Sequence, residues 1–580
     1  MRRFIAILSC FVLSYWGGLA HAREPAPALP LPLPLPSEAL QQFLQDAEAH
    51  RKVIEGDQRK RQLQRATPAP SENNHGAQVI GEGPVGPCWR ITGLQLTGNR
   101  LISDEALRHA VQPLLEPCLN PGQINRILAK VTRLYTDAGY VASRPLLLAP
   151  PTHGQPLELA IEEGFVEAIE LAGEDLPVSL AAAFPGMIGQ PLKLRAIEQG
   201  LDQLNRLRSV DLAADIMPGD LPGGSRVVLR SLQRLPRWQL NAGLDNGGSP
   251  GTGRNRISLN AGFDNPLERN DSLSLYGMYT PGPGHSGSAT FGLYYSLPYG
   301  PWNFSAAANR FRYRSMAKGV MGPIDTSGVS TLLSYSLERA LWRDQRRLLS
   351  ATLRLDDKHN VAYLLSHRIA VQSPRYQTIE AGLNGLWLGD ATWSAFAGYS
   401  RGLGGWSGND GRRYKDPDAQ SARYGKWRAS LSRTASYTWG GLRWTLASSW
   451  AGQYSADRLP HLEAMALAST AAVRGFHGQS ADTANGLAWR NTLYLPFALD
   501  GGVRLTPSLG LDAGWADNRG RTRAATHTQP ARGERLLGAS LGASLEHRHG
   551  SLTVDYQRSL YRRNASLAPG YWQLSLQLRF

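Results

Sequence analysis

Long apolar runs are scarce in this 580-residue sequence. Beyond the N-terminal region, no stretch approaches the roughly 18–20 uncharged apolar residues that a membrane-spanning helix needs. This absence excludes an inner-membrane protein of the helical type, and leaves a soluble protein or one that spans a membrane with strands. The 61 glycines, 15 tryptophans and 21 tyrosines, together with long runs that alternate between apolar and polar residues, favour the strands.

Motifs for catalysis and nucleotide binding are also missing. The sequence contains no P-loop, no G-x-S-x-G, no H-E-x-x-H and no paired-cysteine metal spacing, and its 13 histidines are scattered. The segment Gly284–Gly287 reads G-H-S-G, but it lacks the strand-turn-helix context that a nucleophile elbow needs. We therefore expect no enzyme activity, no cofactor and no metal site.

Acidic residues are fewer than basic ones, 47 against 62, which gives a formal net charge of +15. Basic chains often bind nucleic acid or membranes. The arginines of this chain are spread over the alternating segments, and no nucleic-acid-binding motif is present. The positive charge is thus assigned to a water-filled interior of the alternating segments and to parts of the chain in the periplasm. Nucleic acid is not expected as a partner.

The N-terminal residues have the pattern of a secretory signal peptide. Met1–Arg3 is basic, Phe4–Trp16 is apolar, and Ala20–Ala22 has the small residues of a signal-peptidase site, so residues 1–22 are expected to be removed. Cys10 lies inside this segment, but the preceding Ile7–Ser9 is a poor lipoprotein signal, and a lipid anchor is not favoured.

Cysteine is rare, with three residues in the whole chain. Only Cys88 and Cys118 remain after removal of the signal peptide. Two cysteines in an exported protein suggest one disulfide formed in an oxidising compartment such as the periplasm, and the alternative is a pair of free buried thiols.

A helix is expected over residues 37–65, after a proline-rich lead over residues 23–36. Ser37 is a good N-cap, and one face of the helix is apolar. At about 1.5 Å per residue the helix spans roughly 43 Å, which is long enough to thread a barrel from end to end. The alternative is a surface helix packed on its neighbours. Residues 66–87 are expected to form a flexible linker.

Between residues 88 and 235 the pattern changes to two units with the order strand, helix, helix, strand, strand, over residues 88–163 and 164–235. In the first unit Ser103 begins a short helix, and Asn120 begins a second one. Such small sheets expose strand edges that can capture an extended peptide. The remaining expected elements are strands near Trp89–Leu96, Arg144–Ala149, Pro156–Glu162, Phe165–Leu171, Val210–Met217 and Ser225–Leu232, and helices near Leu176–Phe184 and Lys193–Arg208.

From residue 236 to residue 580 the helical period disappears. Segments such as Arg256–Phe263, Ser272–Tyr276 and Arg504–Trp515 alternate between apolar and polar residues, and about sixteen such segments can be placed. An even number of tilted strands fits a bacterial barrel, because lipid requires every backbone group to be paired within the protein. The alternative, a soluble β-sandwich, would be unusually large at about 345 residues.

The last ten residues predict a final lipid-facing strand. Its apolar side chains fall on one face and end in an aromatic residue: Trp572, Leu574, Leu576, Leu578 and Phe580.

Four groups of short motifs occur in the order in which one known family shows them. They are Pro87–Ile91 with Tyr135–Tyr140, then Gly243–Asn246 with Gly253–Asn255 and Asp264–Leu267, then Val473–Phe476, and then Gly510–Gly514. On these motifs the chain resembles the outer-membrane transporter component of two-partner (type V) secretion systems, the class that includes filamentous-haemagglutinin and haemolysin transporters. The resemblance covers essentially the whole mature chain. The cysteine pair resembles the haemolysin branch more closely.

The resemblance implies a membrane β-barrel of 16 antiparallel strands, two periplasmic α+β POTRA domains and an N-terminal amphipathic plug helix. It also guides the placing of barrel strands near residues 356–388 and 410–436. Trp572 and Phe580 are then expected to act as the C-terminal signal for insertion by the barrel-assembly machinery into outer-membrane lipid.

A long loop is expected to fold back into the barrel. Val473, Arg474, Gly475 and Phe476 match the family's loop-six motif and lie in a connection of about 34 residues, near 453–485. In the strand that carries Gly510, Asp512 and Gly514, alternation turns Asp512 toward the lumen, and the two glycines leave room for another segment. We expect Arg474 to pair with Asp512, with Gly475 at a tight tip. The alternative for Arg474 is an ordinary exposed loop charge.

The function implied by the resemblance is export of one large exoprotein. A POTRA strand edge would recognise the client, the helix over residues 37–65 would leave the pore, and the unfolded client would pass loop six to the cell surface. Adhesin, haemolysin and contact-dependent toxin are all possible clients. The rival functions are an outer-membrane protein assembly insertase, which shares POTRA units and the loop-six motif, and a passive porin.

Overall fold

The computed structural model describes residues 37–65, 87–173, 176–319, 322–344, 346–404, 422–477, 479, 481–517, 533–563 and 566–580. The signal peptide expected at residues 1–22, the proline-rich lead at residues 23–36 and all of the expected linker except Pro87 lie outside these described residues. No described helix has the length and apolar character needed to cross a membrane.

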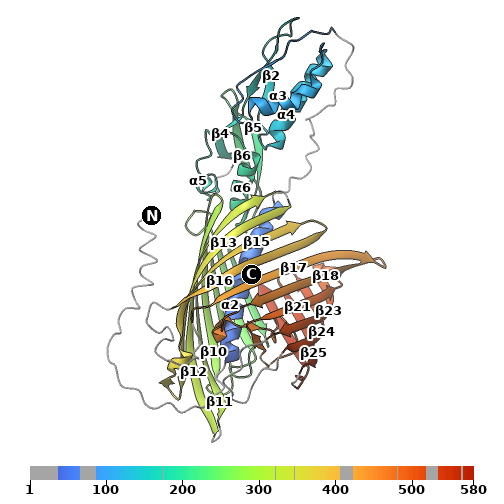
Figure 1. The fold of residues 1–580 in the computed structure, drawn as a ribbon. Helices are drawn as coiled ribbons and strands as arrows, with labels where there is room; N and C mark the ends of the chain where they lie inside the picture. The colour runs from blue at the N-terminus through green and yellow to red at the C-terminus, as the bar shows by residue number, and fades with distance from the viewer. Residues whose placement is uncertain are drawn as a thin grey trace, which may run out of the picture. The chain divides into compact units, whose positions relative to one another are not determined.

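The helix expected over residues 37–65 is present as α2 (Ser37–Arg65). Its first turns bury Leu40 and Phe43 against Phe311 and Tyr313 of the barrel wall, and its last turns bury Leu63 in a second apolar cluster. The helix therefore lies within the ring of strands and is not a surface helix (Figure 1).

The first small unit packs two helices on a three-stranded sheet of order β1-β3-β2. Its elements are β1 (Leu94–Thr97), α3 (Asp104–Val111), η1 (Gln112–Leu114), α4 (Pro121–Asp137), β2 (Arg144–Leu147) and β3 (Leu157–Glu162). The two helix starts follow the sequence, because Ser103 caps α3 and Asn120 forms a capping box with Gln123 at the start of α4.

The first strand differs from the expectation, because it begins at Leu94 and not at Trp89. Trp89 instead makes a single bridge with Leu119, next to a disulfide between Cys88 and Cys118 whose Cα atoms lie 5.5 Å apart. This cross-link holds the entrance of the unit against the segment that precedes α4, so regular pairing with β3 begins only at Leu94.

The second unit has sheet order β4-β6-β5. Its elements are β4 (Phe165–Leu171), α5 (Leu180–Ala183), α6 (Leu194–Asn205), β5 (Val210–Pro218) and β6 (Gly224–Arg234). The helix expected over Leu176–Phe184 is shortened to one turn, because Pro177 precedes it and Ser179 is the residue that caps it. The second helix ends at Asn205, whose side chain exchanges hydrogen bonds with the backbone of Leu212.

A closed antiparallel barrel follows, as the sequence predicts. Eighteen described segments join the ring. Two of these, β14 (His367–Arg368) and β22 (Phe497–Ala498), are only two residues long, and the other sixteen are the wall strands of the barrel. The ring closes where β26 pairs with β7. The wall strands are β7 (Trp238–Asp245), β8 (Arg256–Asp264), β9 (Ser272–Pro281), β10 (Gly287–Tyr299), β11 (Trp302–Gly319), β12 (Gly322–Arg343), β13 (Arg347–Leu364), β15 (Arg375–Leu388), β16 (Ala391–Gly404), β17 (Gly425–Trp439), β18 (Leu442–Tyr454), β21 (Gly486–Tyr494), β23 (Arg504–Ala516), β24 (Glu534–His547), β25 (Gly550–Arg562) and β26 (Tyr571–Arg579).

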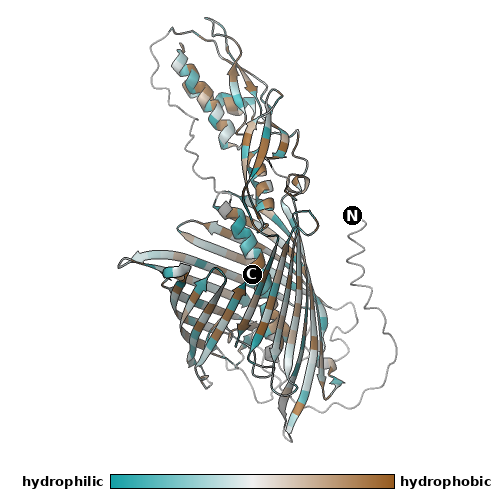
Figure 2. Ribbon diagram, turned by 180° about the vertical axis from the view of Figure 1, so that it is seen from behind, coloured by the Kyte–Doolittle hydropathy of each residue, from teal (hydrophilic) through white to brown (hydrophobic). Residues whose placement is uncertain are grey.

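Hydrophobic and hydrophilic residues follow one another along the strands of the barrel wall (Figure 2), and strand geometry turns neighbouring side chains to opposite faces. On β23, Leu509, Leu511 and Trp515 are exposed on the outer face, while Asp512 is buried on the inner face. The last strand follows the same rule, because Trp572 and the other large apolar residues of its outer face are exposed: Leu574, Leu578 and Phe580.

We expect loss of the disulfide to loosen the first unit. The disulfide closes a loop whose ends are 30 residues apart in sequence. A disulfide across a loop of this length stabilises a fold by about 3–4 kcal/mol, and Cys88→Ser removes this contribution. Limited proteolysis of the full-length protein should therefore cut residues 87–162 faster in the variant, while the barrel stays heat-modifiable. Non-reducing mass analysis of the unmodified protein should show the two cysteine peptides joined, and free thiols at both positions would contradict the cross-link.

Candidate functional site

Loop six, defined here as residues 455–485 between β18 and β21, turns inward and lines the lumen. It contains a short helix, η3 (His461–Glu463), and a two-stranded hairpin of β19 (Met465–Ala466) and β20 (Asp482–Thr483). Its tip is packed in an apolar cluster with residues of β21, β23 and β24: Leu467, Ala472, Val473, Phe476, Ala481, Ala488, Ala516 and Leu536.

Arg474 of loop six makes a bidentate ion pair with Asp512 of β23. The Nε and Nη2 atoms of Arg474 each lie 2.7 Å from a different carboxylate oxygen of Asp512, and the backbone N–H of Arg474 donates to the same carboxylate at 3.1 Å. Asn491 donates its backbone N–H to Asp512 at 3.2 Å and accepts from Arg474 at 2.8 Å. Because the Asp512 side chain is 0% exposed, every charge in this pair has a partner in place of water.

Glycine is required where loop six meets the wall. Gly475 has a φ of +91° and its backbone contacts Arg558, so the tip accepts no side chain. A methyl group at Gly510 would meet the guanidinium of Arg474, and one at Gly514 would meet Val473. Gly538 of β24 has the same role beneath the Arg474 carbonyl. Gly538 was not among the residues predicted from the motifs, although alternation along its strand places it on the lumen face.

Helix α2 is tied to the barrel wall by ion pairs along its length. Asp46 lies 3.4 Å from Arg256 of β8, and Arg59 makes a two-bond pair with Glu338 of β12 at 2.9 and 3.1 Å. Near its N-terminal end, Gln42 donates to the carbonyl of Gly247 at 2.7 Å. None of these wall partners was identified from the sequence, because pairing between distant strands is not encoded in local spacing.

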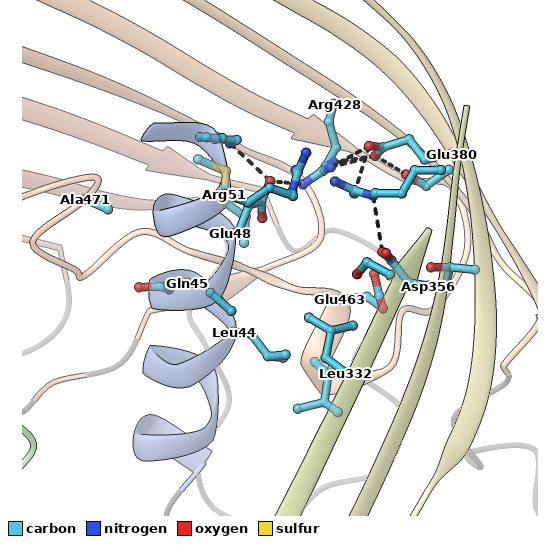
Figure 3. Close-up of a pocket in the computed structure, with 18 of the residues that line it drawn as sticks. Leu44, Gln45, Glu48, Arg51, Leu332, Asp356, Glu380, Arg428, Glu463 and Ala471 are labelled. Atoms are coloured by element: carbon cyan, nitrogen blue, oxygen red, sulfur yellow. Dashed lines mark hydrogen bonds and ion pairs between the residues drawn. The ribbon is translucent and has the colours of Figure 1, made fainter. Parts of the chain in front are cut away.

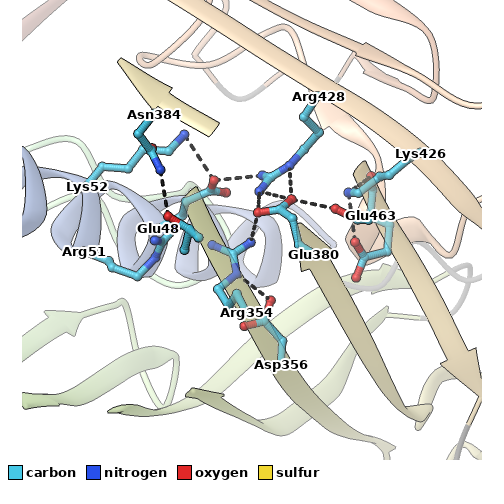
Figure 4. A network of polar contacts seen from close by, with 12 residues as sticks. Glu48, Arg51, Lys52, Arg354, Asp356, Glu380, Asn384, Lys426, Arg428 and Glu463 are labelled. Atoms are coloured by element: carbon cyan, nitrogen blue, oxygen red, sulfur yellow. Dashed lines mark hydrogen bonds and ion pairs between the residues drawn. The ribbon is translucent and has the colours of Figure 1, made fainter. Parts of the chain in front are cut away.

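The most extensive polar network joins α2 to three wall strands (Figure 4). Glu48 accepts from Arg428 of β17 at 2.8 Å, and Arg428 also contacts Glu380 of β15 at 2.6 Å. Arg354 of β13 then pairs with Glu380 at 2.8 Å and with Asp356 at 3.4 Å. The wall charges therefore keep partners among themselves, and on the helix side Glu48 also pairs with Lys52 at 3.1 Å.

A cavity of about 330 Å³ lies between α2, the wall and loop six (Figure 3). Leu44, Glu48 and Arg51 of the helix face it from one side, and Glu380 and Glu463 from the other. The lumen beside the helix is therefore polar and incompletely filled, as a wet channel would be.

Helix α6 of the second unit is buried between its own sheet and the barrel. Asp202 makes a bidentate pair with Arg343 at the end of β12, at 2.6 and 3.0 Å, and Gln203 donates to the carbonyl of Gly300. Burial raises the pKa of Asp202 to about 6, and the hydrogen bonds and charge of Arg343 oppose this shift. Arg206 donates to Gln58 of α2 at 2.7 Å, which links this unit directly to the helix in the lumen.

Over the described ranges, no group of three His, Cys, Asp or Glu side chains is placed to hold a metal ion.

Three models of known families match the chain. The model described as haemolysin secretion/activation protein ShlB/FhaC/HecB matches residues 223–545, which is more than half of the chain. A POTRA domain of the ShlB type matches residues 89–164, and a further POTRA domain matches residues 165–218.

Individual relatives agree over most of their length. The haemolysin transporter protein ShlB of Serratia marcescens is 34% identical over 479 residues, which cover 81% of this chain and 82% of that protein. The haemolysin transporter protein HpmB of Proteus mirabilis is 32% identical over 75% of this chain and 76% of its own. The solved structure of CdiB from Escherichia coli has a TM-score of 0.80 at 26% identity and covers 94% of this chain and 99% of that one. The chain therefore belongs to the haemolysin secretion/activation family, the outer-membrane transporters of two-partner secretion.

Proposed function

We propose that this transporter receives one large exoprotein in the periplasm and passes it, unfolded, through the barrel to the cell surface. The observation that carries the proposal is the helix α2, which lies in the lumen and pairs there with Arg256 and Arg428, each of which also has a carboxylate partner in the wall. When the helix leaves, Arg256 and Arg428 each keep a wall carboxylate, whereas Glu338, the partner of Arg59, keeps the Ser350 hydroxyl as a hydrogen-bond donor. This fits a removable plug better than a permanent core element.

The client is proposed to dock on the edge of β5 in the second POTRA unit, over residues 213–218. On one side β5 pairs with β6, and the described residues place no strand on its other side. The opposite edge strand, β4, is partly covered, because Phe165 bridges Pro191 and Val166 bonds the backbone of Gln190 and Gly189. Ile216 and Met217 are exposed on β5. An extended, amphipathic client segment could add there as another strand.

Docking at β5 is proposed to act on the plug through α6. The helix packs on the sheet that contains β5, and its Arg206 bonds Gln58 of α2. A small shift of α6 would therefore break a direct contact with the plug. Once the lumen is open, folding of the exported client outside the cell would bias its movement outward, since the sequence has no P-loop for nucleotide hydrolysis.

The client class is proposed from the relatives and from the cysteine pair. Two relatives are named as haemolysin transporters, which makes a haemolysin-type exoprotein the first candidate, with an adhesin or a contact-dependent toxin as the others. Trp572 and Phe580 are proposed as the signal read by the barrel-assembly machinery during insertion into outer-membrane lipid. Deleting the gene should remove one large polypeptide from the medium, whereas a general loss of outer-membrane proteins would indicate the insertase.

Breaking the loop-six pair should impair secretion. Arg474→Ala or Asp512→Ala leaves a buried charge unpaired, which costs several kcal/mol locally and releases the loop tip. We expect secretion of the client to fall roughly tenfold or more, with the heat-modifiable barrel still in the membrane. Arg504→Ala and Glu546→Ala are the controls, because these residues are exposed at the rim of β23 and β24. Normal secretion by both pair variants would contradict the role of the pair.

Removing the helix should open the channel. In planar bilayers the full-length protein is expected to be mostly closed, and deletion of residues 37–65 to give a large, steady conductance, because the helix occupies the lumen. Asp57→Ala should stay closed, since Asp57 lies on an exposed part of the helix. Equal conductance of the deletion and the unmodified protein would show that the helix is not a plug.

A further inference from the structure

Loop six is held to the barrel at two separate places. The Arg474–Asp512 pair fixes its tip to β23, as described above. Glu463, at the end of η3, fixes its first half to a different part of the wall, formed by β13, β15 and β17. The two anchors share no residue, so each can be lost without the other.

The Glu463 anchor is a buried carboxylate between two lysines. The side chain of Glu463 is 3% exposed; it contacts the Nζ atom of Lys358, lies 2.9 Å from that of Lys426 and accepts from the Tyr376 hydroxyl at 3.0 Å. The Glu463 carbonyl also accepts from Lys426 and from Gln453, each at 3.0 Å. Two ammonium groups thus share one carboxylate of the loop, and removing that carboxylate would leave both without this partner.

The neighbouring residue, Leu462, links the Glu463 anchor to the plug helix α2 by packing. Leu462 packs against the cluster formed by Leu40 and Phe43 of α2 with Phe311 and Tyr313 of the wall, where the Phe43 and Phe311 rings stack at 5.1 Å. It also packs against the wall cluster that contains Tyr376. In Figure 3 Glu463 lies across the cavity from α2, close to Leu332. The first half of loop six therefore packs against the N-terminal turns of α2.

We propose that Glu463 is a positioning residue that keeps the plug seated, and that it does so independently of the Arg474–Asp512 pair. The tip anchor keeps loop six inside the barrel, whereas the Glu463 anchor sets the half of the loop that presses on α2. This inference rests on the proposed role of α2 as a plug. Loss of the carboxylate leaves Lys358 and Lys426 facing each other without a counter-charge. The first half of the loop then moves away, and Leu462 loses its packing against Leu40 and Phe43 of α2.

The rival explanation is that Glu463 serves only the stability of the barrel. Two variants separate the explanations. Glu463→Gln keeps the shape of the side chain and removes its charge. Glu534→Gln is the matched control, because Glu534 is also buried and pairs with Arg562 at 2.6 Å, but it lies outside the cavity beside α2.

Plug position can be measured directly by thiol labelling. Ala47→Cys places a thiol on the cavity side of α2, where it is half-buried while the plug is seated. Val53→Cys, at a position that is 60% exposed, reports labelling that does not depend on release. The native cysteines are joined and do not react.

We expect Glu463→Gln to raise the open fraction in planar bilayers, and the labelling rate at position 47, by roughly tenfold or more, which corresponds to about 1.4 kcal/mol. Glu534→Gln should match the unmodified protein in both measurements. Added trypsin should spare Arg474 in Glu463→Gln but cut there in Asp512→Ala, since only the latter frees the tip. Adding Lys358→Met and Lys426→Met to Glu463→Gln should close the channel again, because no unpaired charge remains.

The outcomes are distinguishable. If deletion of residues 37–65 conducts freely while Glu463→Gln stays closed and labels slowly, this inference is wrong and the plug remains. If the deletion itself stays closed, the proposed plug fails and the inference fails with it. If Glu463→Gln opens the channel but trypsin then cuts at Arg474, the two anchors are not independent, and the inference is also wrong.

Discussion

Lipid offers no hydrogen bonds, and this constraint shapes everything after residue 236. Each backbone N–H and C=O group of the membrane segment must be paired within the protein, so the sheet has no free edge and β26 returns to β7. Closure creates an inside and an outside, and side-chain alternation assigns each residue to one of them. The polar inner face then needs partners of its own. Helix α2 and loop six supply part of them, because their charged groups meet arginines, lysines and carboxylates of the wall.

The interior contacts fall into two energetic classes. The Arg474–Asp512 pair and the Glu463 cluster are almost fully buried, and removing one partner would strand a charge. The contacts of α2 with Arg256 and Arg428 are partly hydrated, and the wall residue retains a second carboxylate in each case. The loop is therefore the durable element and the helix the exchangeable one. The proposed function needs such a division, because a plugged transporter has to stay closed at rest and yet admit a polypeptide.

Much of this architecture could be predicted from the sequence, and the failures have physical causes. Alternation identified the barrel and turned Asp512 inward, and caps placed the starts of α3 and α4. The strand expected from Trp89 was shortened because the disulfide and the Leu119 bridge hold that segment elsewhere. Glu463 and Gly538 escaped notice because their importance arises from residues that are distant in sequence. A lumen-facing lysine such as Lys358 marks a charge that needs a partner, but it does not reveal which acid provides it.

Helix α2 belongs to the same chain as the barrel that it fills. Residues 66–86 connect it covalently to the first POTRA unit, and a covalently connected group competes for its site at an effective concentration that does not depend on the amount of protein. Under the proposed function, an incoming client must displace helix α2 from the lumen. After the end of the client has passed, the helix is still available to bind there again. Resealing is then a first-order event whose rate is independent of how many transporters the membrane contains.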